Sequence, residues 1–271
     1  MKKIISQISK YKELPINYSF YPSDLTDAPI IIYFHGGGLL FGQRDDLPDD
    51  YISLLVNNGY HFLAIDYLLA PESQLTTILE VLTKSLSHLL KQFQVKTYHF
   101  MGRSAGSYLA YYLIRQGFEP QSFLSFYGYY QLTLPEFSLP TPFYLSYPFV
   151  SSTAVESFIG TAPLTHGNMN KRFPIYLSSR QSGNWLNYLT THDKREYFSL
   201  TDTDLMTFPP TLLLHSLNDP DVPYRLSKKA SELIANSQLI SINGNQHDFD
   251  RVVTSETLAV YQQIVTFLNA T

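Results

Sequence analysis

The chain has 271 residues, 44% of them hydrophobic and 15% aromatic, which is enough apolar material for one large domain with a full core. Its 19 Lys and Arg against 23 Asp and Glu give a net charge of −4. With no basic cluster long enough to follow a phosphate backbone, a nucleic-acid partner is not expected. The absence of cysteine excludes disulfides, thiolate metal sites and a cysteine nucleophile, and it fits a reducing compartment.

Residues 1–14 resemble the start of a signal peptide only in part. Two lysines follow Met1, but Ser6, Gln7 and Ser9 interrupt the apolar stretch that such a peptide requires. No other run approaches the roughly 20 apolar residues of a membrane span. We therefore expect a cytoplasmic protein without a membrane span. The sequence leaves the oligomeric state open, a homo-oligomer included.

From residue 29 onward, near-continuous apolar runs alternate with amphipathic segments. The runs “PIIIYFH” and “YHFLAIDY” have the composition of parallel strands that are covered on both faces. The predicted elements are, in order, a strand at 29–35, a helix ending at Gly59, a strand at 60–67, a helix at 75–93, a strand at 97–102, a helix at 105–117 and a strand at 122–128. This alternation predicts a mostly parallel, doubly wound α/β sheet with helices on both faces.

The alternation stops at about residue 129 and resumes after about residue 207. The intervening segment is rich in Pro, Tyr, Phe, Ser and Thr, with helix-like patches at 152–159 and 182–189. The pattern then continues with a strand at 209–216, a helix at 223–236, a strand at 237–243 and a helix at 254–268. We therefore predict a single domain spanning 1–271, in which residues 129–207 form a cap-like insertion that covers a site.

The stretch “GRSAG” lies where the strand at 97–102 passes into the next helix. Gly102 and Gly106 stand two residues before and after Ser104, where a sharp turn leaves no room for a β-carbon. Such a turn holds the serine hydroxyl out of the sheet at a helix N-terminus, and the amide of Ala105 points toward a developing oxyanion. A merely tight turn is the alternative interpretation.

The stretch “FHGGGLLFG” follows the strand at 29–35. Adjacent glycines suit a loop whose amides must approach a ligand, and neither phosphate-binding glycine motif is present. Together with Ser104, the amides of Gly37 and Gly38 complete an oxyanion hole that begins at Ala105. We expect His35 to organise this loop rather than to transfer protons.

A nucleophilic serine needs a general base, and eight histidines are available. His247 follows the last predicted strand and precedes the last helix, which suits the chain order serine, acid, histidine. His215 ends a strand and is a further histidine within reach of a site. The orienting acid should follow the preceding strand, where Asp219 is favoured and Asp221 is the alternative. If Asp219 is the acid, Asp221 is available to cap the N-terminus of the next helix.

These motifs resemble those of the α/β-hydrolase superfamily, in its hormone-sensitive-lipase-like esterase and carboxylesterase group. “HGGG”, “DYLLAPE”, “GRSAG”, “DPDVP” and the final histidine occur in the family order across most of the chain outside the insertion. The resemblance implies an α/β-hydrolase fold. It also implies Ser104 as nucleophile, Asp219 as acid, His247 as base, and Gly37, Gly38 and Ala105 as oxyanion donors. Arg103 and Ser107 depart from residues common in the family.

The resemblance implies a serine carboxylesterase that acts on a small-molecule ester with no cofactor and no metal. A short-chain or aromatic acyl group is favoured over a long-chain lipid because no exposed apolar lid helix is evident. Arg103, Lys171 and Arg180 are candidates to pair with an anionic substrate, but we expect each to be a surface charge. Three alternatives stay open: a thioesterase, an aminoacyl or peptidyl hydrolase with the same triad, and a small-molecule-binding member of the fold without catalysis.

Overall fold

The computed structural model describes residues 1–271 and contains one eight-stranded sheet. The strand order is β1-β2-β4-β3-β5-β6-β7-β8. The six strands from β4 to β8 in this order are parallel to one another, whereas β2 pairs in antiparallel fashion with both β1 and β4. The strands are β1 (Ile4–Tyr11), β2 (Leu14–Tyr21), β3 (Ile30–Phe34), β4 (His61–Ile65), β5 (Tyr98–Arg103), β6 (Ser122–Phe126), β7 (Thr211–Ser216) and β8 (Ser237–Ile242).

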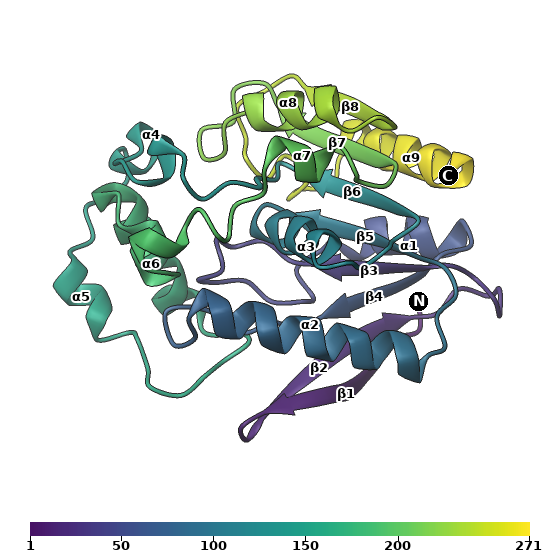
Figure 1. The fold of residues 1–271 in the computed structure, drawn as a ribbon, viewed down its shortest axis with the longest axis horizontal. Helices are drawn as coiled ribbons and strands as arrows, with labels where there is room; N and C mark the ends of the chain where they lie inside the picture. The colour runs from purple at the N-terminus through teal and green to yellow at the C-terminus, as the bar shows by residue number, and fades with distance from the viewer.

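Helices cover both faces of this sheet (Figure 1). One face carries α2 (Leu75–Gln92), α3 (Ala105–Arg115) and α8 (Arg225–Leu233), and the other carries α1 (Asp49–Asn57) and α9 (Ser255–Ala270). A separate hydrophobic cluster fills the space on each side, because alternate residues of the same strand point to opposite faces. The predicted parallel α/β sheet with helices on both faces is confirmed. No helix is both long and apolar enough to span a membrane.

The hairpin formed by β1 and β2 is absent from the sequence-based prediction, which considered residues 1–14 only as a possible leader. In β1, an edge strand, only Ile8 is buried. In β2, buried positions such as Ile16 and Tyr18 alternate with more exposed ones. Neither strand has the continuous apolar run that marked the central strands, so only the tertiary structure reveals this part of the sheet.

The segment between β6 and β7 contains the helices α4 (Pro142–Leu145), α5 (Ser152–Glu156), α6 (Met169–Ser182) and α7 (Asp202–Leu205). The helix-like patch predicted at 152–159 contains the short α5, and the one at 182–189 contains the 3-10 helix Trp185–Tyr188. The longer helix α6, which ends at Ser182, was not predicted. The sequence conceals α6 because it contains Pro174 and buries polar side chains, so that it has no apolar stripe.

The helix α6 is anchored to the loops that follow β3 and β4. Arg172 donates to the carbonyl oxygen of Leu40 at 2.8 Å and to both carboxylate oxygens of Glu72, at 2.8 and 2.9 Å. Figure 1 shows α4, α5 and α6 grouped beside the ends of β3 and β6. This segment therefore lies over the carboxyl edge of the sheet, where ligands bind in open α/β folds.

The helix α4 and the residues after it expose large apolar side chains, among them Leu145 and Phe149, which are 55% and 79% exposed. The cap therefore has exposed apolar side chains on and after a one-turn helix, which the sequence analysis did not predict. Four residues are too short to show amphipathic periodicity, which is why the pattern gave no signal.

Candidate active site

Ser104 occupies the sharp turn between β5 and α3. Its backbone lies at φ 52° and ψ −114°, a region that non-glycine residues rarely adopt. A β-carbon on Gly102 would lie 2.4 Å from the amide nitrogen of Ser107, and one on Gly106 would lie 2.0 Å from the carbonyl oxygen of Phe34. Both flanking glycines are therefore required for this turn, as the sequence analysis expected.

The structure brings Ser104, His247 and Asp219 together, although 143 residues separate the serine from the histidine. The Ser104 hydroxyl lies 2.9 Å from Nε2 of His247, and Nδ1 of His247 lies 2.7 Å from Oδ2 of Asp219. With the proton on Nδ1, the serine donates to Nε2 and the imidazole donates to the carboxylate. This is the hydrogen-bonded line that activates a serine hydroxyl.

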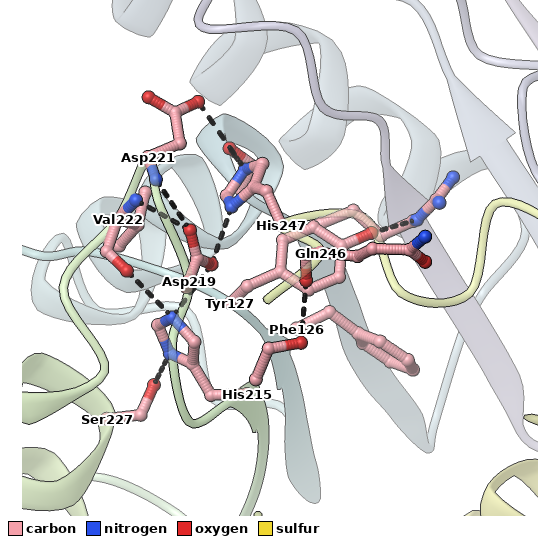
Figure 2. A network of polar contacts seen from close by, with 12 residues as sticks. Phe126, Tyr127, His215, Asp219, Asp221, Val222, Ser227, Gln246 and His247 are labelled. Carbon is pink, nitrogen blue, oxygen red and sulfur yellow. Dashed lines mark hydrogen bonds and ion pairs between the residues drawn. The ribbon is translucent and has the colours of Figure 1, made fainter. Parts of the chain in front are cut away.

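Asp219 is held in place from several directions. Its Oδ1 accepts hydrogen bonds from the amides of Asp221 and Val222 at 2.8 and 2.9 Å, and its Oδ2 lies 3.0 Å from Nε2 of His215 (Figure 2). Burial raises the pKa of Asp219, but the charges and hydrogen bonds of His247 and His215 outweigh burial and hold it well below the usual range. Asp219 is therefore ionised at neutral pH.

Asp221 approaches the other nitrogen of the same imidazole. Its Oδ2 lies 3.9 Å from Nε2 of His247, and Figure 2 shows the two carboxylates at opposite ends of the ring. The same oxygen accepts hydrogen bonds from Tyr144 and Tyr176 at 2.9 and 2.5 Å, and Oδ1 lies 3.0 Å from a guanidinium nitrogen of Arg180. Asp221 thus links the histidine to the segment between β6 and β7 and does not orient Nδ1.

The charges around His247 favour its protonated form. Burial lowers the pKa of His247, but the Asp219 carboxylate, its hydrogen bond, and the charges of Asp221 and Asp248 outweigh burial and raise the pKa to about 9. An imidazolium at this position is therefore strongly stabilised.

The loop after β3 presents free amides beside Ser104. Gly37 and Gly38 adopt φ values of +104° and +59°, and their amides make no hydrogen bond within the protein. A β-carbon on Gly36 would lie 3.6 Å from that of Ser104, which places this loop against the serine. Ala105 is the first residue of α3, so its amide also lacks a helical partner. These three amides are suited to hold a negatively charged oxygen.

Gly38→Ala is expected to lower kcat/KM by about 100- to 1,000-fold, the usual effect of losing one oxyanion donor. The added β-carbon would approach the Tyr176 ring to 2.4 Å, and φ +59° disfavours alanine, so the loop must shift. The control is Gly117→Ala, which has φ +93° but no atom within 4 Å of its β-carbon. Steady-state ester kinetics on both variants checks this prediction, and equal losses would contradict it.

His35 lies under the glycine loop. Its ring stacks on Tyr67 at 4.1 Å between centroids, and its Nδ1 lies 2.7 Å from the carbonyl oxygen of Gly36. Burial lowers the pKa of His35 to about 4, although the Gly36 hydrogen bond opposes that shift. The ring is therefore neutral at pH 7 and packs against the loop that it was expected to organise.

Arg103 is not a surface charge, contrary to the sequence-based expectation. It is 6% exposed, donates from Nε to the Tyr127 hydroxyl at 2.6 Å and pairs with Asp250 at 2.8 Å. The Tyr127 ring in turn lies edge-on to His247, 4.7 Å between centroids. Arg103 directly precedes Ser104, and Asp250 lies in the loop that carries His247. Their ion pair therefore connects the turn of the serine with the loop of the histidine.

Arg180 is likewise buried, at 1% exposure, whereas Lys171 is exposed as expected. Tyr127 and Tyr144 belong to the aromatic stretch 126–149, whose rings suggest a pocket lining or simple packing of the insertion, whereas no sequence signal indicated Tyr176. Long-range packing places all three beside the site. The position of His215 near the end of a predicted strand, four residues before Asp219, did indicate that it lies within reach of the site.

A family model described as the alpha/beta hydrolase fold matches residues 31–251. Two solved structures are similar over nearly the whole chain. An alpha/beta hydrolase superfamily protein from Enterococcus faecalis has a TM-score of 0.89 and 28% identity, covering 100% of this chain and 99% of that one. A protein of unknown function from Staphylococcus aureus subsp. aureus Mu50 has a TM-score of 0.90 and 27% identity, covering 98% of both chains.

A versiconal hemiacetal acetate esterase from Emericella nidulans is 29% identical over 93 residues, which are 34% of this chain and 32% of that protein. The chain aligns with 32% or less of the length of the curated relatives that it matches. These relatives therefore resemble only part of the chain.

Proposed function

We propose, from the premise that this chain belongs to the α/β-hydrolase family, that it is a serine hydrolase of carboxylic esters. The observation that carries this proposal is the hydrogen-bonded line from Ser104 through His247 to Asp219 at the carboxyl edge of the sheet. The esterase from Emericella nidulans supports an ester as the substrate class.

In the proposed reaction, the Ser104 oxygen attacks the ester carbonyl while Nε2 of His247 takes the serine proton. The carbonyl oxygen becomes an oxyanion held by the amides of Gly37, Gly38 and Ala105, and Asp219 stabilises the imidazolium. His247 then gives its proton to the departing alcohol, which leaves an acyl group on Ser104. Water, deprotonated by His247, attacks the acyl group and regenerates the serine.

The cap, defined as residues 129–207, restricts the substrate in this proposal. Ser104 is only 7% exposed, and Tyr176 and Trp185 of the cap reach the glycine loop: Trp185 donates from Nε1 to the Gly38 carbonyl oxygen at 2.9 Å. An enclosed serine favours a short-chain or aromatic acyl group over a long lipid chain.

The rate is expected to rise with pH through the pKa of His247, because only the neutral imidazole accepts the serine proton. Since Asp219 and Asp221 raise that pKa toward about 9, the acid limb of kcat/KM should have its midpoint above 6.5, the ordinary value for histidine. The sequence alone places this midpoint near pH 6 to 7. A kcat/KM profile from about pH 5 to 10 measures it, and a flat profile would exclude His247 as the base.

A fluorophosphonate probe tests the proposal, together with matched ester, thioester and aminoacyl substrates. We expect stoichiometric labelling of the wild-type protein and the highest kcat/KM on the ester. Faster turnover of the thioester or aminoacyl substrate would assign the same triad to another bond. A folded protein that neither labels nor hydrolyses any of them would favour a binding function without catalysis.

A further inference from the structure

Three cap residues, Tyr176, Arg180 and Trp185, form a cluster with Asp221, which follows β7; this cluster is called the roof because it connects the glycine loop with His247. The Tyr176 ring lies so close to Gly38 that a β-carbon there would approach it to 2.4 Å. Its hydroxyl donates to Asp221, whose carboxylate lies 3.9 Å from Nε2 of His247 (Figure 2). The roof thus spans from the oxyanion loop to the base and borders the space that a substrate must occupy.

The Arg180 guanidinium in this roof is only partly satisfied. One terminal nitrogen pairs with Asp221, at 3.0 Å from the carboxylate and 3.1 Å from the carbonyl oxygen. The other terminal nitrogen and Nε are buried and have no hydrogen-bond partner. The rings of Phe137, Tyr144 and Trp185 lie 5.7, 5.8 and 5.2 Å from its central carbon. These rings attract the charge but are weak acceptors for the remaining N–H groups.

Tyr129 places a second unsatisfied group beside the same rings. Its hydroxyl is buried without a partner, and its ring packs on Phe137 and Trp185 with centroid distances of 5.2 and 5.6 Å. Arg180 and Tyr129 therefore border one aromatic enclosure, defined by Phe137 and Trp185, and both carry unpaired donors. Arg180 also pairs with Asp221, which approaches His247. Buried donors without a partner destabilise a protein, and a bound molecule that accepts their hydrogen bonds would remove this cost.

We propose that this enclosure is a substrate subsite for an uncharged oxygen acceptor, an ether, hydroxyl or carbonyl oxygen a few bonds from the scissile carbonyl. The inference rests on the proposed ester hydrolysis and narrows its substrate class to oxygen-bearing esters. Arg180 is already paired with Asp221, so its charge is neutralised. A neutral oxygen accepts the free donors without adding a charge to this buried site, whereas a carboxylate would be buried there without a cation of its own.

The test uses ester pairs that differ by one CH₂ replaced with oxygen. Methyl methoxyacetate against methyl butanoate examines the acyl side, and 2-methoxyethyl acetate against butyl acetate examines the alcohol side. Each kcat/KM is divided by the rate constant for hydroxide-catalysed hydrolysis of the same ester, which corrects for the intrinsic reactivity of that ester. We expect at least about a tenfold preference for the oxygen-bearing ester in one pair, the value of one good hydrogen bond. Monomethyl succinate against methyl pentanoate supplies the anionic comparison.

Two variants link the preference to the roof. Tyr129→Phe removes only the hydroxyl oxygen, and Arg180→Lys keeps the positive charge beside Asp221 with a different set of donors. Both should bring the preference toward unity. The matched control is Tyr130→Phe, whose buried hydroxyl also lacks a partner but whose ring packs on Tyr111. It should keep the preference. If Arg180→Lys fails to fold, Tyr129→Phe still decides the matter.

The outcomes separate this inference from the proposed function. If the alkyl esters are hydrolysed and the normalised kcat/KM of the oxygen-bearing ester equals that of its alkyl partner in both pairs, the subsite is overturned but the esterase proposal stands. That result would indicate that water satisfies the donors. Faster normalised hydrolysis of monomethyl succinate than of methyl pentanoate overturns the choice of an uncharged group. A preference that Tyr129→Phe leaves intact overturns the assignment to this enclosure. No hydrolysis of any ester contradicts the proposed function itself.

Discussion

Replacing Ser104 with alanine is expected to lower kcat by about 10⁴- to 10⁶-fold, because the remaining site has no nucleophile to form an acyl-enzyme. The fold should persist, since the change removes only the oxygen that contacts His247. The variant should still bind ester, and fluorophosphonate labelling should disappear. Single-turnover kinetics and intact-protein mass spectrometry measure the two effects.

Ser107→Ala provides the matched control for this change. Like Ser104, Ser107 is buried, but it lies within α3. Its hydroxyl donates to the carbonyl oxygen of Gly102 at 2.6 Å and does not contact His247. That variant should keep its label and most of its turnover. Persistent labelling of Ser104→Ala at full stoichiometry would place the nucleophile on another residue and refute the proposed mechanism.

Asp219→Asn is expected to lower kcat by about 10⁴-fold. The asparagine is neutral, so it no longer stabilises the imidazolium, and its amide nitrogen can favour the wrong imidazole tautomer at Nδ1. The same change should lower the pKa of His247, because the Asp219 carboxylate is the largest of the causes that raise it. A pH profile of kcat/KM would show the acid limb at lower pH.

Asp221→Asn distinguishes the two carboxylates that the sequence left as alternatives. We expect a smaller loss of kcat, because Asp221 does not contact Nδ1, and a larger loss of stability, because the buried Arg180 loses its charged partner. Thermal unfolding and ester kinetics on both variants compare these effects. A greater loss of kcat in Asp221→Asn than in Asp219→Asn would reverse the assignment of the acid.

The sequence predicted the central elements well because their signals are local. The strands β3, β4, β5, β6 and β7 are mostly buried in a sheet with helices on both faces, so they appear as short apolar runs. The glycine spacings around Ser104 and at residues 36–38 report backbone conformations that exclude a β-carbon, which is also a local requirement. The edge hairpin and α6 have no such signal.

The sequence did not predict that two arginines beside the site are buried. Arg103 and Arg180 were expected on the surface because isolated arginines usually lie there. Each is instead buried against a carboxylate far away in the sequence: Arg103 pairs with Asp250 and Arg180 with Asp221. A residue's charge is visible in the sequence, but its partner is not.

The sequence by itself thus determined the class of fold, the order of its central strands and helices, and the chemical types placed at their ends, since these follow from periodicity and backbone sterics. Only the tertiary structure decided that Asp219 contacts Nδ1 of His247 while Asp221 ties the cap to the site. It also placed unpaired donors of Arg180 and Tyr129 around the same aromatic rings of the cap. Hydrogen bonds and ion pairs depend on distances of a few ångströms between chain segments, and those distances are set by packing rather than by local sequence.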